Sequence, residues 1–385
     1  MNRRLVLPLA AVALAACATS PPPKPALTLD VAALDAGAQA LMRRAGVQGL
    51  ALAVIDGGQV AHVAAYGHRN VERGLPLTTD TVMYGASLTK TAFAYMVLQL
   101  VDEGHLDLDA PLAELLPRPL PEYPDYTDLA GDERWRALTA RVVLNHTTGF
   151  ANFRSLEDDG RLRFHFQPGT RYGYSGEGLY VLQLALEEGL GLDVGAEMQR
   201  RVFDRFGMTR TSMTWRADFA GDLADGYRKD GAMEPHDERS SVSAAGSMDT
   251  TIADQARLWA GIVRGDGLSV ASRAELVRPQ AAITSAHQFP TLRDWVGAGN
   301  AEIGLAAGLG LVTFRDRSGP AWFKGGHNDW TGNMAICLES GKRCVVMLAN
   351  DVRAERIYPE LARLALGETR MPWHWEYTWP EAAQR

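Results

Sequence analysis

A serine and a lysine three residues apart could form a catalytic pair near the start of an apolar stretch. The sequence "YGASLTKTAFAYMVLQLVDEG", residues 84–104, places Ser87 and Lys90 on one face if a helix begins near Ser87. The free amides and dipole of a helix N-terminus would favour an alkoxide and an oxyanion there. Lysine can serve as the base only if burial or neighbouring cations lower its pKa. The alternative is a helix-capping serine beside a solvated lysine.

The use of lysine along the chain supports the catalytic interpretation. There are only five lysines against 34 arginines, so arginine supplies most of the surface cations. Arginine stays protonated and cannot act as a base, whereas lysine can. Lys90 and Lys324 therefore indicate sites where arginine could not substitute.

The segments around this pair predict a sheet assembled from both ends of the chain. Residues 49–67 read as two strands joined by a Gly-Gly turn, and the helix after Ser87 should run to about Val101, with Gly104 as its stop. We expect an α/β (α+β) fold in which an antiparallel sheet is flanked by helices and interrupted by a mainly helical insertion at roughly 105–265. Further helices are expected at 177–189, 251–264 and 354–366, and the later strands at "LGLVTF", "AWFKGG", "NMAICLE" and "CVVMLAN".

Two later motifs complete a pattern that starts at Ser87-Leu88-Thr89-Lys90. Tyr174-Ser175-Gly176 and then Lys324-Gly325-Gly326 follow it in the order of S-x-x-K, a Ser/Asn-type element and K-T-G. With stretches such as "GHLDLDAPL", "LTARVVLNHTTGF" and "FQPGTRYGYSGEGLYVLQ", the chain resembles the beta-lactamase-related serine hydrolases over about residues 33–365. That broad family contains class C β-lactamases, D,D-peptidases and carboxylesterases. The resemblance implies a β-lactamase/transpeptidase-like fold.

The same resemblance implies a role for each motif residue. Ser87 would be the nucleophile, Lys90 its proton partner, and Tyr174 the group that passes protons to the leaving group and activates the deacylating water. Lys324 would keep Tyr174 and Lys90 proton-poor through its positive charge. The backbone amides of Ser87 and His327 would form the oxyanion hole.

Two glycines depart from the family pattern. Gly176 stands where the family usually has Asn, although some branches carry Tyr-Ser-Gly. Gly325 stands where Thr or Ser is common, which removes a hydroxyl that helps to hold a substrate carboxylate, while Gly326 would let substrate approach the backbone. Both departures favour an ester or a D-amino-acid/peptide-type amide as substrate. The alternative is a β-lactamase or D,D-carboxypeptidase that acts on β-lactams or peptidoglycan stem peptides.

Rival interpretations have weaker support. "GYSGEG" makes Ser175 a near miss of the α/β-hydrolase elbow, but no regular βαβ pattern surrounds it. His146 could be proposed as a triad base, yet the loop that carries it is structural in the family. An inactive binding lipoprotein would usually have lost the Ser or Lys of S-x-x-K. We predict no metal and no cofactor, because the remaining histidines lack metal-ligand spacing; they include His62, His68, His105 and His236.

The first residues predict export and a lipid anchor. A positive start and the apolar run "LVLPLAAVALAA" suit a secretory signal over 1–17, and Leu14-Ala15-Ala16-Cys17 resembles the lipobox, with Cys17 as the lipidated residue. Residues 18–28 are a Pro-rich linker, and 29–385 are expected to form one hydrolase domain. Ala18 is not the inner-membrane retention signal, so we expect an outer-membrane anchor facing the periplasm.

Cysteine and charge content narrow the remaining possibilities. Cys337 and Cys344 flank "LESGKR" and could face each other across a hairpin as a disulfide, or remain two small buried thiols. The net charge of −7 gives no basic footprint for nucleic acid, so the expected partner is a small ester, peptide or β-lactam. Loops near 115–135, 151–170 and 285–300 are expected to shape the pocket. The sequence gives no indication of the oligomeric state.

Overall fold

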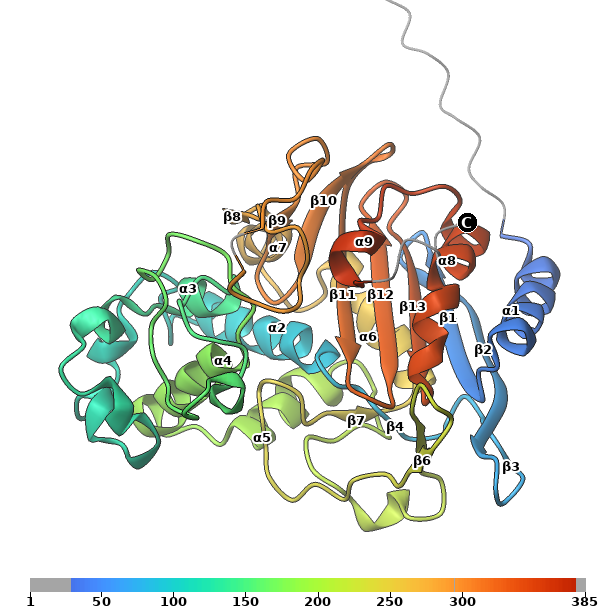
Figure 1. The fold of residues 1–385 in the computed structure, drawn as a ribbon, viewed down its shortest axis with the longest axis horizontal. Helices are drawn as coiled ribbons and strands as arrows, with labels where there is room; N and C mark the ends of the chain where they lie inside the picture. The colour runs from blue at the N-terminus through green and yellow to red at the C-terminus, as the bar shows by residue number, and fades with distance from the viewer. Residues whose placement is uncertain (1–28, 294, 379–385) are drawn as a thin grey trace, which may run out of the picture.

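A computed structural model describes residues 29–293 and 295–378 (Figure 1). The predicted signal segment, Cys17 and the Pro-rich linker lie outside these residues. Among the described helices, none is long and apolar enough to cross a bilayer.

A nine-stranded antiparallel sheet forms the centre of the fold, in the order β3-β2-β1-β13-β12-β11-β10-β9-β8. Strand β1 pairs with β13, so the first and last long strands lie side by side, as Figure 1 shows in blue and orange-red. The predicted sheet from both chain ends is therefore confirmed. The strands are β1 (Gly49–Asp56), β2 (Gln59–Asn70), β3 (Leu75–Pro76), β8 (Ala281–Ala282), β9 (Ala306–Ala307), β10 (Val312–Asp316), β11 (Gly319–His327), β12 (Gly332–Leu338) and β13 (Arg343–Ala349).

Helices cover both faces of this sheet because its central strands are apolar on both sides. In β1, Leu50, Leu52 and Val54 join one buried cluster while Ala51 and Ala53 join the other, as the two-residue period of a strand requires. The first cluster includes side chains of α1 (Val31–Ala45) and α8 (Tyr358–Leu366). The second includes α2 (Leu88–Asp102) and α6 (Ile252–Arg264). The predicted helices at these places are thus present.

The segment between β2 and β8 is mostly helices, turns and loops (Figure 1). The predicted helix at 177–189 is α4 (Gly176–Leu184) followed by a π-helical turn over Ala185–Gly189. Helix α2 is buried along nearly its whole length, since it runs between the sheet and this helical region. The other elements are α3 (Ala140–Leu144), α5 (Val194–Met198), α7 (Val270–Val277), α9 (Trp373–Glu376) and the short strand pairs β4 (Met83–Tyr84) with β7 (Asp249–Thr250) and β5 (Gly226–Tyr227) with β6 (Met233–Glu234).

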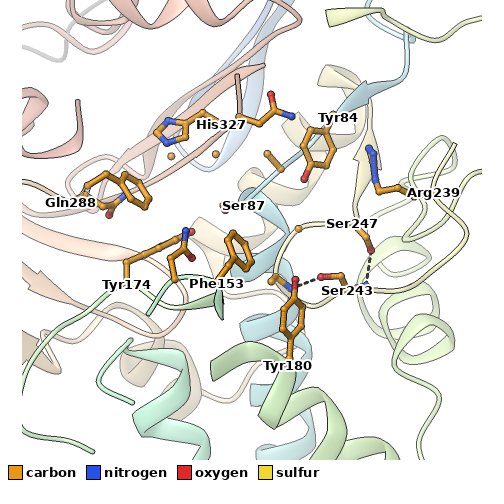
Figure 2. Close-up of a pocket in the computed structure, with 18 of the residues that line it drawn as sticks. Tyr84, Ser87, Phe153, Tyr174, Tyr180, Arg239, Ser243, Ser247, Gln288 and His327 are labelled. Atoms are coloured by element: carbon orange, nitrogen blue, oxygen red, sulfur yellow. Dashed lines mark hydrogen bonds between the residues drawn. The ribbon is translucent and has the colours of Figure 1, made fainter. Parts of the chain in front are cut away.

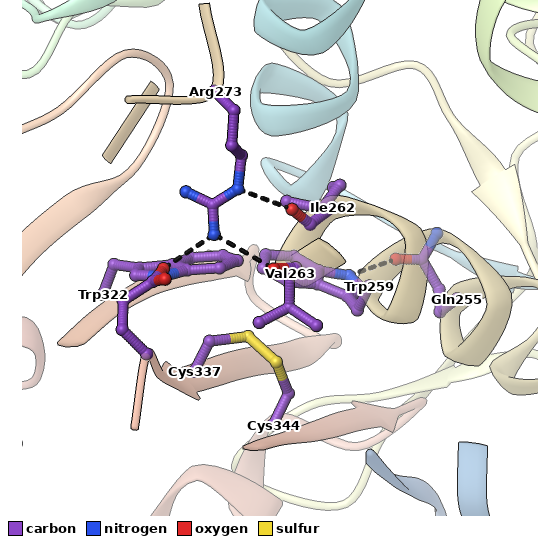
Figure 3. The surroundings of a disulfide bond; sticks show 9 residues. Gln255, Trp259, Ile262, Val263, Arg273, Trp322, Cys337 and Cys344 are labelled. Atoms are coloured by element: carbon purple, nitrogen blue, oxygen red, sulfur yellow. Dashed lines mark hydrogen bonds and ion pairs between the residues drawn. A yellow bond between two sulfur atoms is a disulfide. The ribbon is translucent and has the colours of Figure 1, made fainter. Parts of the chain in front are cut away.

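A disulfide joins β12 to β13 under helix α6 (Figure 3). Cys337 and Cys344 are direct partners in the register, with their Cα atoms 4.1 Å apart. Next to them the rings of Trp259 and Trp322 stack at 5.5 Å. Both cysteines are fully buried, so the bond ties the hairpin together inside the core.

Candidate active site

Ser87, Tyr174 and residues 325–327, which sequence analysis selected, line one pocket of about 360 Å³ (Figure 2), and the other two predicted residues, Lys90 and Lys324, contact Ser87 and Tyr174. The N-terminus of α2 supplies its floor at Ser87, and the end of β11 supplies one wall from Gly325 to His327. In Figure 2, Ser87 lies between Tyr174 and Phe153 on one side and His327 and Tyr84 on the other. Further lining residues come from loops, namely Asn152, Phe153, Arg239, Ser241, Ser243, Ala245, Gly246, Ser247, Gln288, Phe289 and Asn328, and from Glu376 of α9.

A strained turn presents Ser87 at the helix N-terminus. Ala86 has a φ of 46°, a left-handed conformation that few non-glycine residues adopt. The turn is closed by the Leu88 amide, which donates to the Gly85 carbonyl at 3.1 Å. Such strain costs on the order of 1–3 kcal/mol and is retained where the surrounding structure enforces it, often at functional sites. Ser87 itself is only partly buried and faces the pocket.

Lys90 meets the requirement for a basic lysine. Its side chain is 1% exposed, and its Nζ donates to Ser87 Oγ at 2.9 Å and to the Ala245 carbonyl at 2.5 Å. Burial lowers the pKa of Lys90, and the charge of Lys324 lowers it further, while Tyr174 opposes the shift. Lys90 is therefore held against the serine hydroxyl in an environment that disfavours its protonated form.

Tyr174 lies between the two lysines. Lys324 Nζ donates to the Tyr174 hydroxyl at 3.1 Å and to the Gly325 carbonyl at 2.9 Å. Burial alone would raise the pKa of Tyr174, but Lys324, Lys90 and the Ser87 hydroxyl together lower it to about 7. Tyr174 can therefore lose its proton near neutral pH and form a phenolate beside Ser87.

His146 and Ser175 have structural positions. His146 is 3% exposed, its ring lies 4.4 Å from that of Tyr174, and its Nδ1 accepts the Ser175 amide at 3.2 Å. Burial and the two lysines lower the pKa of His146 well below its usual value, so the ring is neutral. Ser175 is fully buried and caps α4, with its Oγ accepting the Gly178 amide at 3.1 Å. His146 therefore packs against Tyr174. The Ser175 hydroxyl is buried and cannot reach a substrate.

The end of β11 offers backbone groups to the pocket. Strand β10 pairs with β11 only as far as Phe323, so the edge from Lys324 to His327 is left free on that side and borders the pocket. A Cβ at Gly326 would lie 2.9 Å from the amide nitrogen of Ser87. Only glycine permits this close approach, which brings the backbone next to His327 up to the helix N-terminus.

Neighbouring side chains account for the two unexpected glycines. A Cβ at Gly176 would lie 2.5 Å from Cε1 of Phe153, so an aromatic ring takes the space next to position 176. A Cβ at Gly325 would overlap Oε1 of Glu376. The sequence motifs showed that positions 176 and 325 lack a side chain. They did not show that Phe153 and Glu376 fill the space, because these two residues come from distant segments without a recognisable spacing.

The loops around the pocket match the expectations only in part. Asn152 and Phe153 come from the predicted 151–170 loop, and Gln288 and Phe289 from the predicted 285–300 loop. None of the described residues that line the pocket comes from 115–135, where a third loop was expected. Residues of the segment 239–247 line the pocket instead, a contribution that the sequence analysis did not predict.

No metal site accompanies these residues in the part of the chain that the structure describes. Within residues 29–293 and 295–378, no three His, Cys, Asp or Glu side chains gather closely enough to hold an ion. Lys90 contacts Ser87 Oγ, and its ammonium form would repel a cation there.

The fold and the Ser-Lys-Tyr-Lys cluster together define a class of protein, the penicillin-binding and β-lactamase-type serine hydrolases. The chain belongs to the Beta-lactamase family, whose model matches residues 34–368. The predicted family and fold class are thus confirmed.

Individual relatives are more distant. A D-aminopeptidase from Gluconobacter oxydans is 28% identical over 201 residues, which cover 51% of this chain and 38% of the relative. Esterase EstB from Burkholderia gladioli is 29% identical over 213 residues, 48% of this chain and 52% of the relative. The crystal structure of D-alanine carboxypeptidase AmpC from Burkholderia cenocepacia matches with a TM-score of 0.68 at 20% identity, covering 87% of this chain and 98% of that one. The matched part of this chain spans about half or less of the length of these two curated relatives.

Proposed function

We propose that this chain is a serine hydrolase that works through an acyl-enzyme on Ser87. The observation that carries the proposal is the buried Lys90, whose Nζ lies 2.9 Å from Ser87 Oγ. If Ser87 were only a helix cap, Lys90 could remain in water. Burying a lysine costs free energy, so its burial beside Ser87 favours a catalytic role over a structural one.

The proposed mechanism transfers one proton at each step. Ser87 Oγ attacks the substrate carbonyl while its proton passes to Lys90 or Tyr174, and the oxyanion is held by the amides of Ser87 and His327. The same proton then moves through Tyr174 to the leaving oxygen or nitrogen, and the carbonyl–leaving group bond breaks. Water attacks the acyl-enzyme with Tyr174 as base, which releases the acid and restores the Ser87 hydroxyl.

We propose an ester or a D-amino-acid/peptide-type amide as the substrate. Relatives named as a D-aminopeptidase and an esterase support these two classes. The loss of a hydroxyl at Gly325 and of an amide at Gly176 argues against the alternative, a β-lactamase or D,D-carboxypeptidase, since those residues would help to bind β-lactams and C-terminal carboxylates. The likeness to a D-alanine carboxypeptidase structure supports the fold alone.

Covalent labelling with a fluorophosphonate tests the proposal. The soluble domain, residues 27–385, is compared by intact mass as wild type, Ser87→Ala and Ser175→Ala. We expect one adduct in wild type and in Ser175→Ala, and none in Ser87→Ala. Loss of the adduct only in Ser175→Ala would refute the S-x-x-K mechanism, and no adduct in wild type, even with a β-lactam probe, would favour the inactive binding lipoprotein.

We also propose that the chain is exported and held at the outer membrane by a lipid on Cys17. The support is the sequence pattern alone, a basic start, an apolar run and Leu14-Ala15-Ala16-Cys17. A periplasmic position would give the pocket access to small esters and peptides of the envelope.

A further inference from the structure

Residues 371–378, an aromatic segment near the end of the described chain, contribute Glu376 to the lining of the pocket. Helix α9 ends at Glu376, which lines the same pocket as Ser87. Two hydrogen bonds fix the segment to the neighbouring loop: the backbone N–H of Gln288 donates to the backbone carbonyl of Trp375 at 2.7 Å, and Trp375 Nε1 donates to Ser285 Oγ at 3.2 Å. The position of Glu376 is therefore set by the fold.

The carboxylate of Glu376 is buried without a hydrogen-bond partner. The residue is 2% exposed, and both oxygens lack a donor among the described residues. Lys324 Nζ makes no hydrogen bond to Glu376 and donates instead to Tyr174 and to the Gly325 carbonyl. His327, the other nearby basic side chain, has a different carboxylate beside it, since its Nδ1 lies 3.0 Å from Glu355 Oε1. A buried carboxylate in this state is costly unless a donor reaches it from elsewhere.

The pocket itself is the direction from which a donor can come. Glu376 is the only acidic residue among the described residues that line it. Its Oε1 occupies the space that a side chain at position 325 would need, at the free edge of β11. At the position of Thr in the K-T-G pattern, this chain therefore has Gly325 and places the carboxylate of Glu376 beside it, which favours a positive rather than a negative group of the substrate there. Arg239, which also lines the pocket, is paired with Asp249 at 2.8 Å.

We propose that Glu376 is a specificity-determining residue that binds a cationic ammonium group of the substrate and excludes a carboxylate. The substrate class is thereby narrowed to esters or amides that carry an amino group close to the scissile carbonyl. Burial raises the pKa of Glu376 and Glu355 adds to this, while Lys324 and His327 lower it; a bound ammonium would further stabilise the ionised form. This inference rests on the proposed hydrolase function.

An isosteric substrate series measures the charge preference. D-Alanine p-nitroanilide carries an ammonium, isobutyryl p-nitroanilide replaces it by a methyl group, and the methylmalonyl p-nitroanilide replaces it by a carboxylate. We expect wild type to prefer the ammonium substrate over its neutral isostere by roughly 30-fold or more in kcat/KM, as one charge-assisted hydrogen bond would give, and to act least on the carboxylate. Glu376→Gln should lose this preference, and Glu376→Asp should keep part of it.

The controls separate specificity from a purely structural role. Glu360→Gln, on the surface of α8 and paired with Arg44, should leave the preference unchanged. Glu376→Gln should still be labelled at Ser87 by a fluorophosphonate, which checks its fold. If Glu376 only balanced the charges of Lys324 and His327, all three substrates would change in proportion and their ratios would stay constant, which would overturn the proposal.

A binding measurement keeps the test independent of turnover. Calorimetry on Ser87→Ala compares D-alanine anilide with isobutyranilide, and tighter binding of the cation that disappears in Ser87→Ala/Glu376→Gln supports the role of Glu376. Equal binding of both amides to Ser87→Ala refutes it. Failure of Ser87 labelling with preserved cation binding would instead refute the hydrolase function alone.

Discussion

Replacing Lys324 by methionine should move the pH dependence of Ser87 reactivity upward. Lys324 Nζ and the Tyr174 hydroxyl are 3.1 Å apart, and in an effective dielectric constant of about 20 their charges attract by roughly 5 kcal/mol. That energy corresponds to about 4 pKa units, from which relaxation and water entry will subtract. Starting from a pKa of about 7, the pKa of Tyr174 should rise to roughly 10 in Lys324→Met.

The sign of the effect follows from the role of the phenolate. If Tyr174 rather than Lys90 accepts the Ser87 proton in the proposed mechanism, only its deprotonated form is reactive, so the reactive fraction grows as pH rises through the pKa of Tyr174. At pH 7 the phenolate fraction should fall from about one half to about one thousandth, so labelling should slow several hundred-fold and recover towards pH 10.

The assay is the pseudo-first-order rate of fluorophosphonate labelling between pH 5 and pH 10, which needs no knowledge of the substrate. Lys324→Arg keeps the positive charge, so its midpoint should stay near that of wild type although the bulkier guanidinium lowers the rate at every pH. Lys342→Met, in the β12–β13 turn, is a matched lysine removal far from the site. An unchanged midpoint in Lys324→Met, with the rate lowered equally at every pH, would refute the electrostatic reasoning.

Other consequences can be tested separately. Gly176→Asn should lower the free energy of unfolding by about 1–3 kcal/mol, because its Cβ would overlap Phe153, and Phe153→Ala should relieve much of that loss; equal urea midpoints for Gly176→Asn and wild type would contradict the packing. Cys337→Ala/Cys344→Ala should lose about 2–3 kcal/mol of stability, the loop-closure value for so short a ring, and intact mass under denaturing conditions should show wild type 2 Da below the dithiol form. Cys17→Ser should abolish incorporation of radiolabelled palmitate into the full-length chain, and labelling that persists in this variant would refute the anchor.

The candidate catalytic residues could be predicted from the sequence because the chemistry requires fixed residue types in short motifs. Ser87 and Lys90 share a helix turn, so a local rule placed them together, and the family motif order then placed Tyr174 and Lys324. The strands could also be predicted from local sequence, because runs such as residues 49–56 are apolar on both faces.

Other residues that line the pocket could not be predicted from the sequence in the same way. Glu376 contacts the pocket through a packing relationship between α9 and the end of β11, and its partner at position 325 is a glycine with no side chain to signal a contact. Phe153 and the 239–247 segment likewise reach the pocket through loop paths that no periodicity records. These features follow from tertiary packing and become visible only in three dimensions.

The pairing of β1 with β13 has a consequence for how the chain folds. Leu50 lies opposite Ala349, so β1 has one neighbour, β2, from its own hairpin and another, β13, from a segment about 300 residues later in the sequence. Contacts of such long sequence separation form slowly, because the entropy of closing the intervening chain is lost before the sheet is complete. Until β13 docks, β1 presents an apolar strand with an unpaired edge, which is the kind of surface that recruits other chains. Refolding yield should therefore depend steeply on protein concentration, with aggregation as the competing reaction.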